Sequence, residues 1–231
     1  TSSPNCQLLL NDGSGRFLAP SPLPFSSIPS DLALADIDGD ADLDLVATLS
    51  ASDFFAFRRN DGAGVFAAAL GFNLLTRGGD NPRQFAMGDL DRDGDLDAVV
   101  VHRNTDNVIA IRNANGLFSS AAFLNVPIPG GVATDRVALA DLELDGDLDL
   151  VVGDNANFPG PHHVVTVVND GTGVFGGAVS RDLESQGLGL VVADLDGDLD
   201  PDLVSSNFAS RSKVLVNGCT GAVRLATVLA F

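Results

Sequence analysis

Apolar residues occur in short runs that recur along the whole chain. The first run of each repeat shows period-two patterning and always ends in Ala or Gly, and a second apolar run follows it after an acidic segment. Each pair of runs predicts a β-hairpin, and helix-type periodicity is almost absent. The expected first strands are Leu32–Ala35, Phe85–Gly88, Val137–Ala140 and Leu190–Ala193, and the expected second strands begin at Leu43, Ala98, Leu148 and Leu203.

A second turn motif lies between the acidic segments. It begins with Asn and contains Gly, and these two residues favour tight turns because they tolerate positive φ. An apolar stretch precedes each copy, so each repeat predicts two hairpins and four strands. The small residues of the first strand place it where backbones approach closely, nearest the axis of the fold. The five copies begin at Asn11, Asn60, Asn113, Asn169 and Asn217.

The acidic segments set the period of the chain. Their first residues are 53, 52 and 53 positions apart, and a fixed period of this length indicates a repeat architecture. Four-stranded units of about 50 residues are typical of propeller blades. The sequence therefore predicts an all-β fold, a β-propeller of four-stranded antiparallel blades, with four blades and an extra N-terminal hairpin. We expect one domain over residues 1–231, with the hairpin at about 5–25 and repeats at about 31–80, 84–130, 135–185 and 188–231.

Each acidic segment carries five acids at alternate positions, here numbered 1 to 9. Carboxylates this close repel one another, and a hard divalent cation relieves the repulsion. Calcium takes 6–8 oxygen ligands, so we expect about four Ca²⁺ ions. By analogy with other calcium loops, positions 1, 3, 5 and 9 offer side-chain oxygens and position 7 a backbone carbonyl, its carboxylate facing solvent. The candidate metal ligands are Asp36, Asp38, Asp40, Asp42, Asp44, Asp89, Asp91, Asp93, Asp95, Asp97, Asp141, Glu143, Asp145, Asp147, Asp149, Asp194, Asp196, Asp198, Asp200 and Asp202.

The repeated motif resembles a known family. Asp-x-Asp-x-Asp-Gly-x-x-Asp followed by an apolar strand, as in Asp89–Val99, is similar to the FG-GAP and VCBS repeats of integrin α-chain heads and many secreted bacterial proteins. The resemblance covers about residues 5–223 and implies calcium binding between the first two strands of each blade. Loops one and four depart from the motif, with Gly39 and Gly197 at position 4, and loop three has Glu143 at position 3. These departures are expected to change calcium affinity.

The two kinds of hairpin differ in number, with five Asn-Gly hairpins and four acidic ones. Three arrangements are compatible with the mismatch. The N-terminal hairpin caps or closes a four-bladed ring, or the chain is a fragment of a larger propeller, or the exposed half-blade pairs with another molecule by β-augmentation. An unpaired strand edge has to be covered in one of these ways.

Composition narrows the classes of partner. The chain has 13 Lys and Arg against 31 Asp and Glu, a formal charge of −18, which disfavours nucleic acid because phosphate binding needs clustered cations. The absence of an 18-residue apolar run predicts no membrane span. The chain has neither Trp nor Tyr, the usual stacking residues of sugar sites, so carbohydrate is a disfavoured partner. A start at Thr1 fits a processed secreted chain or a trimmed one, and we expect a secreted, extracellular or cell-surface protein.

The cysteines leave two possibilities open. Cys6 and Cys219 are the only two, and they either form a disulfide or stay as free thiols. A blade places them toward opposite rims, so a bridge between stacked molecules fits better than an intrachain one. The lack of a C-x-x-C motif argues against a structural zinc site.

No catalytic constellation is evident. His162 and His163 are adjacent and point to opposite faces of a strand, so we expect a loop or strand edge there, and His102 is expected at an exposed strand end. The basic pairs Arg58–Arg59 and Arg211–Lys213 are expected to be solvated strand ends. There is no Gly-x-Ser-x-Gly elbow. The sequence favours a non-enzymatic scaffold that binds protein partners or copies of itself, and the alternative is a lectin-type module.

Overall fold

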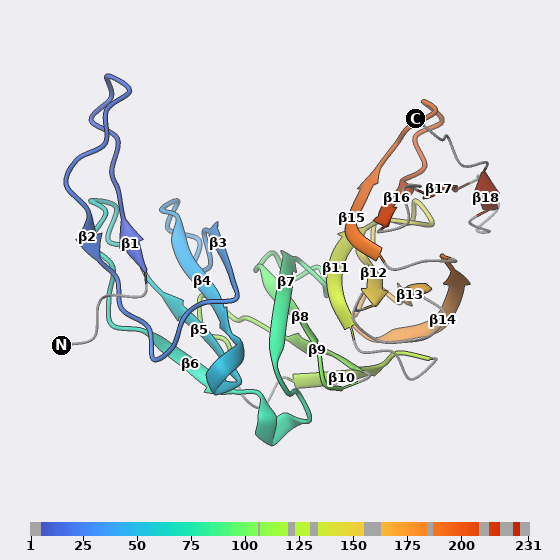
Figure 1. The fold of residues 1–231 in the computed structure, drawn as a ribbon, viewed down its shortest axis with the longest axis horizontal. Helices are drawn as coiled ribbons and strands as arrows, with labels where there is room; N and C mark the ends of the chain where they lie inside the picture. Colours follow the sequence, from blue (N-terminus) through green and yellow to red (C-terminus); the bar gives the residue numbers. More distant parts are fainter. Residues whose placement is uncertain are drawn as a thin grey trace.

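Four antiparallel sheets of four strands each make up most of the molecule, and a two-stranded hairpin precedes them (Figure 1). The computed structural model describes residues 6–105, 107–119, 123–129, 134–154, 163–183, 187–207, 213–217 and 224–226. Within each sheet the strands lie in chain order, so every connection joins neighbouring strands. This arrangement confirms the all-β class and the four-stranded antiparallel units.

The strand bounds follow the predicted runs closely. The N-terminal hairpin has β1 (Gln7–Leu8) and β2 (Ser21–Pro22). Sheet 1 has β3 (Asp31–Ala35), β4 (Asp44–Leu49), β5 (Phe54–Arg58) and β6 (Leu70–Asn73). Sheet 2 has β7 (Pro82–Gly88), β8 (Asp97–His102), β9 (Asn107–Ile111) and β10 (Phe123–Pro127). Sheet 3 has β11 (Thr134–Ala140), β12 (Asp149–Asp154), β13 (His163–Asn169) and β14 (Phe175–Asp182). Sheet 4 has β15 (Gly187–Ala193), β16 (Asp202–Asn207), β17 (Lys213–Val216) and β18 (Arg224–Ala226). Two 3₁₀ turns are η1 (Ser50–Ser52) and η2 (Leu75–Arg77).

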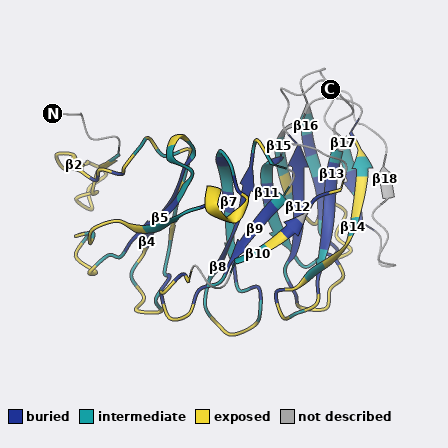
Figure 2. Cartoon of the chain, turned by 90° about the horizontal axis from the view of Figure 1, so that it is seen from below, coloured by how far each residue is buried: buried dark blue, intermediate teal, exposed yellow. Residues whose placement is uncertain are grey.

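The core lies between successive sheets. All six residues of β4, β8 and β12 are buried, because these strands are covered on both faces (Figure 2). Between sheets 1 and 2, the ring of Phe55 meets those of Phe85 and Phe118 edge to face, with centroids 6.1 and 5.2 Å away. Aromatic rings prefer this geometry. Similar apolar layers join sheets 2 and 3 and sheets 3 and 4.

The sheets follow one another along an open arc (Figure 1). The first strands β3, β7, β11 and β15 lie toward its concave side, as the small residues of these strands predict. In the described part of the chain, sheets 1 and 4 do not meet, so the arc is not closed into a ring.

His102 is buried, so the prediction of an exposed strand end is wrong. It ends β8 with no exposed surface, and its backbone N–H and C=O both bond to Thr134 Oγ1 of sheet 3, at 3.0 and 2.9 Å. The ring also lies against Gly79, where a Cβ would collide with it. Burial lowers the pKa of His102 to about 4, so the ring is neutral at pH 7.

Arg58, the last residue of β5, is not a solvated strand end either. Arg58 is 9% exposed and donates to the carbonyls of Pro24 and Ala67, with its guanidinium 5.2 Å from the centre of the Phe25 ring. These contacts fix the segment between the hairpin and sheet 1. Cys6 is a half-buried free thiol. Cys219, His162 and Arg211 lie outside the described residues.

Candidate metal centres at the acidic loops

The Asp at position 9 joins the two hairpins of each sheet. Asp97 is fully buried, and its two carboxylate oxygens accept from Leu90 N at 3.1 Å and from Asn113 N at 2.8 Å. The first donor belongs to the acidic loop and the second begins the Asn-Gly turn. Asp44, Asp149 and Asp202 make the same pair of bonds in their own sheets. The Asp at position 9 therefore holds the acidic loop and the Asn-Gly turn of its sheet together, in addition to being a candidate metal ligand.

The Asp at position 1 closes the loop around itself. In loop two, Asp89 accepts from Asp93 N at 3.1 Å and from Gly94 N at 3.0 Å, and in loop one Asp36 accepts from Gly39 N at 2.8 Å and from Ala41 N at 2.9 Å. Multiple backbone donors favour the ionised carboxylate. The loop thus presents a charged, oxygen-rich interior.

Positions 4 and 6 have positive φ in all four loops. In loops two and three Gly stands at position 6, while in loops one and four it stands at position 4. The other position of the pair is then occupied by Ala41, Arg92, Leu144 or Leu199, with φ between 56° and 77°. The shifted glycine therefore keeps positive φ at both positions, but the Asp at position 1 accepts from the N–H of position 4 in loops one and four and of position 5 in loops two and three.

The carboxylates at position 7 do not face solvent, in contrast to the sequence prediction. Asp147 and Asp200 are 6% and 2% exposed, and Asp95 Oδ2 accepts from Asn115 N of the neighbouring turn at 2.7 Å. Asp42 and Asp147 point at the glycines of the equivalent turns. The side chain at position 7 thus braces the Asn-Gly turn of its own sheet.

Three of the loops gather acids closely enough to hold a cation. Three carboxylate oxygens lie within 4.8 Å of one another in Asp36–Asp38–Asp40, in Asp89–Asp91–Asp97 and in Asp194–Asp196–Asp202. Loop three, with Asp141, Glu143 and Asp145, forms no such group among the described residues. The structure thus brings together positions 1 and 3 with position 5 or 9.

Buried carboxylate oxygens at these loops have no donor. Among the described residues, nothing donates to Asp38 Oδ1, Asp91 Oδ1 or Asp200 Oδ2, although all three atoms are buried. An unpaired buried carboxylate oxygen is costly. Burial also raises the pKa of Asp97 and of Asp149 to about 6, and the two backbone N–H groups offset this only in part. A cation bound by positions 1 and 3 would pair the oxygens of Asp38 and Asp91, so the residues of loops one and two fit an oxygen-ligated divalent metal.

Arginines at the loops were missed by the sequence analysis. Arg59 lies 3.4 Å from Asp38 and also donates to Gly116 O of sheet 2, and Arg112 pairs with Asp91 and donates to Thr172 O of sheet 3. Each arginine directly precedes the Asn of a turn motif, which is the signal that could have identified them. They tie position 3 of one loop to the turn of the next sheet.

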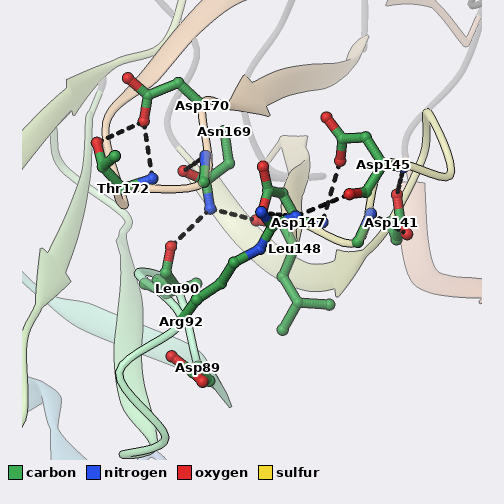
Figure 3. Close-up of polar contacts among 12 residues, drawn as sticks. Asp89, Leu90, Arg92, Asp141, Asp145, Asp147, Leu148, Asn169, Asp170 and Thr172 are labelled. Atoms are coloured by element: carbon green, nitrogen blue, oxygen red, sulfur yellow. Dashed lines mark hydrogen bonds and ion pairs between the residues drawn. The ribbon is translucent and has the colours of Figure 1, made fainter.

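The asparagines of the turn motif are the second set that the sequence analysis missed. Asn169 Nδ2 donates across the sheet boundary to Leu90 O at 2.8 Å and within its own sheet to Leu148 O at 3.2 Å (Figure 3). Asn113 and Asn217 likewise reach Ile37 O and Leu142 O, at 2.7 and 2.9 Å. Each acceptor is the backbone carbonyl at position 2 of the acidic loop in the preceding sheet. We call this cross-sheet bond the Asn latch, and its signal was the Asn shared by all five motifs.

The comparisons with known proteins agree with this repeat geometry. Two crystal structures of BBS1N in complex with ARL6DN, one soaked with mercury and one with lead, superimpose with TM-scores of 0.60 and 0.57 at 11% and 10% identity. They cover 89% and 86% of this chain, which spans only 58% and 55% of theirs. These neighbours are β-propeller-like, and at such identity the likeness concerns the fold alone. No curated protein matches the chain.

No helix of the described residues is long and apolar enough to cross a membrane. The model of the FG-GAP-like repeat matches residues 36–100 and 93–152, which together span about half of the chain. Both matches contain acidic loops with the geometry described above. The chain belongs to the FG-GAP-like repeat family.

Proposed function

We propose that this protein is a non-enzymatic, extracellular scaffold of β-propeller blades that is stabilised by calcium and binds protein partners or copies of itself. The observation that carries the proposal is a pair of buried carboxylate oxygens without a donor, Asp38 Oδ1 in loop one and Asp91 Oδ1 in loop two, each within a group of three converging acids. Asp38 and Asp91 lie where their sheets meet the next sheet, so a cation there would strengthen both the hairpin and the sheet boundary.

Calcium is the ion that the donor set favours, because the ligands are carboxylates and backbone carbonyls without Cys or His. Positions 1 and 3 with position 5 or 9 would hold it. The clusters support three sites, and the expectation of a fourth ion in loop three rests on the sequence repeat. Calcium concentrations outside cells suit loops of moderate affinity, which supports an extracellular location.

The protein-binding role is supported by the family and by the fold. The repeats place sheets along an arc with exposed loops and two open ends, and BBS1N, which shares the fold, was crystallised with a protein partner. The chain spans just over half of the BBS1N chains. The proposal of no enzyme activity rests on the lack of a nucleophile–base pair in the sequence.

The test is thermal unfolding with calcium and with excess chelator. Binding to the folded state alone stabilises by RT ln(1 + [L]/Kd), about 2.7 kcal/mol per site at a hundredfold excess over Kd. Calcium should therefore raise the melting temperature clearly, and magnesium less, because Mg²⁺ demands smaller octahedral sites. Identical melting curves in calcium and in chelator would refute the metal part of the proposal.

A further inference from the structure

The N-terminal hairpin is built like the outer half of a sheet. Its turn closes through Leu18 N, which donates to Leu10 O at 2.8 Å, and sheet 1 closes its own turn through Ala67 N and Arg59 O at 2.8 Å. The isolated bridge between Asn11 and Phe17 likewise matches a bridge in the turn of sheet 1. The hairpin therefore has the local geometry of strands three and four of a sheet.

The hairpin is also placed as the outer half of a sheet that precedes sheet 1. Leu10, the residue before its turn Asn, lies beside Gly64 of sheet 1, where an added Cβ would be 3.3 Å from Leu10 Cδ1. Arg112, the residue before the turn Asn of sheet 2, lies beside Gly173 of sheet 3 in the same way. The hairpin thus stands to sheet 1 as the outer strands of sheet 2 stand to sheet 3.

The inner half of this preceding sheet is not found among the described residues. Phe85 of β7 and Val137 of β11 pack against the preceding sheet and are each 6% exposed, whereas Leu32 and Leu34 of β3 are 44% and 58% exposed. Within the described residues β1 pairs with β2 alone, so its other edge has no strand beside it. A groove of about 420 Å³ remains between the hairpin and β3. Its lining includes Cys6, Leu8, Leu32, Leu34, Leu45 and Phe66.

Two polar groups at the rim are also left without the partners that they have elsewhere. In the described part of the chain the side-chain amide of Asn60 donates only within sheet 1, to Leu43 O at 3.2 Å, so its Asn latch is not made. The backbone N–H of Asn60 bonds to Asp44 at 2.7 Å, but no described carboxylate accepts from the equivalent N–H of Asn11. One missing acidic loop would supply both acceptors.

We propose that this groove binds an acidic β-hairpin presented by a partner polypeptide, which completes the sheet that the N-terminal hairpin begins. One strand of the incoming hairpin pairs with the free edge of β1, and its apolar residues cover Leu32 and Leu34. The carbonyl at position 2 of its loop accepts from Asn60, and the carboxylate at position 9 accepts from Asn11. The inference rests on the proposed scaffold function and names the partner class.

A second copy of this chain does not offer such a hairpin. Each of its four acidic hairpins is already paired with outer strands in its own sheet. The proposed donor is a polypeptide whose acidic hairpin lacks outer strands. Such complementation adds main-chain hydrogen bonds and apolar burial together.

The first test uses a synthetic peptide of residues 82–106, the acidic hairpin of sheet 2, added to the full chain in saturating calcium. We expect saturable one-to-one binding. Leu34→Glu should weaken it about tenfold or more, because it puts a charge against the apolar strand. Asn60→Asp, which keeps the acceptor and removes the donor, should also weaken it. Val174→Glu, at a 51% exposed residue in the turn of sheet 3, is the control and should leave binding unchanged.

The second test joins the hairpin covalently, so that weak folding of the peptide is not limiting. Replacing residues 1–4 with residues 82–106 builds the missing strands in the order that the other sheets use. The melting temperature should rise by several degrees, and Leu34→Glu should remove most of the gain. A joined chain that melts no higher than the parent would overturn the proposal.

The outcomes separate the possible occupants. If the joined chain is stabilised but the free peptide does not bind, the proposal of a separate partner is wrong. The groove is then filled by a segment of the same polypeptide. Self-association of the unmixed chain that Leu34→Glu abolishes would overturn it in favour of a second copy. Failure of the calcium test with retained peptide binding would reject the metal role and leave the groove standing.

Discussion

The Asn latch offers the sharpest test of how the sheets hold together. Asn169→Ala removes the donor to Leu90 O in sheet 2, and Asn169 is only 2% exposed. Asn60→Ala is the matched control, because Asn60 occupies the same position of its motif, is partly exposed and bonds only within sheet 1. The two substitutions delete the same atoms, so they differ mainly in the cross-sheet bond.

The structure sets the expected magnitudes. Leaving one buried acceptor unsatisfied costs about 1–3 kcal/mol, and the Asn169 variant also loses its weaker bond to Leu148 O, for a total of about 2–4 kcal/mol. Asn60→Ala exposes its acceptor to water and should cost about 1 kcal/mol. The difference of about 1–3 kcal/mol measures the latch. Asn113→Ala, whose amide reaches Ile37 O at 2.7 Å, should repeat the larger value.

The assay is urea unfolding of the three variants in saturating calcium. Repeat proteins are stabilised by their nearest-neighbour interfaces, so loss of a latch should also broaden the transition or split it. Equal costs for Asn169→Ala and Asn60→Ala would show that the cross-sheet bond adds no stability, and the sheet boundary would then be held by apolar packing without the latch.

Single residues give three further predictions. Gly94→Ala should destabilise by about 1–2 kcal/mol because φ is +94° although nothing lies within 4 Å, whereas Gly176→Ala, also in open space but without positive φ, should be neutral in the same urea assay. His102 has a pKa lowered to about 4, so its contribution to stability is full above pH 6.5 and is lost as the pH falls toward 4. From pH 7 to pH 5 the stability should drop by about 2 kcal/mol relative to His102→Phe, and parallel pH profiles would contradict this. Asp91→Ala should weaken calcium binding measured by calorimetry more than Asp95→Ala, because Asp91 is one of the three converging acids of loop two, whereas the Asp95 carboxylate braces the turn and its loss should lower stability; equal affinities would contradict the ligand order.

The sequence by itself determined the repeat and its strands. Period-two apolar runs, tight-turn residues and a constant spacing are local properties, so residues 85–88 and 98–101 could be assigned to neighbouring strands without a structure. The acidic loops were found for the same reason, since alternate acids in a turn are visible in one stretch of chain. The ligand preference of carboxylates then suggested calcium.

Only the tertiary structure decided what lies between the sheets. The Asn latch joins Asn169 to Leu90, two residues far apart in the chain, and no local pattern distinguishes a turn Asn from a cross-sheet donor. From the sequence alone His102 is a polar residue at a strand end, yet in the structure the next sheet covers it. From the sequence alone Arg59 is expected to be a surface cation, yet in the structure it contacts two sheets.

The open arc and the groove beside β3 were likewise decided by the tertiary structure alone. The count of hairpins showed one Asn-Gly hairpin without an acidic partner, but three arrangements satisfied that count equally. The exposure of Leu32 and Leu34 and the unlatched amide of Asn60 place the gap at the first sheet, because burial depends on which residues meet in space. Local sequence sets the strands, whereas packing between distant segments decides which faces, donors and acceptors remain free.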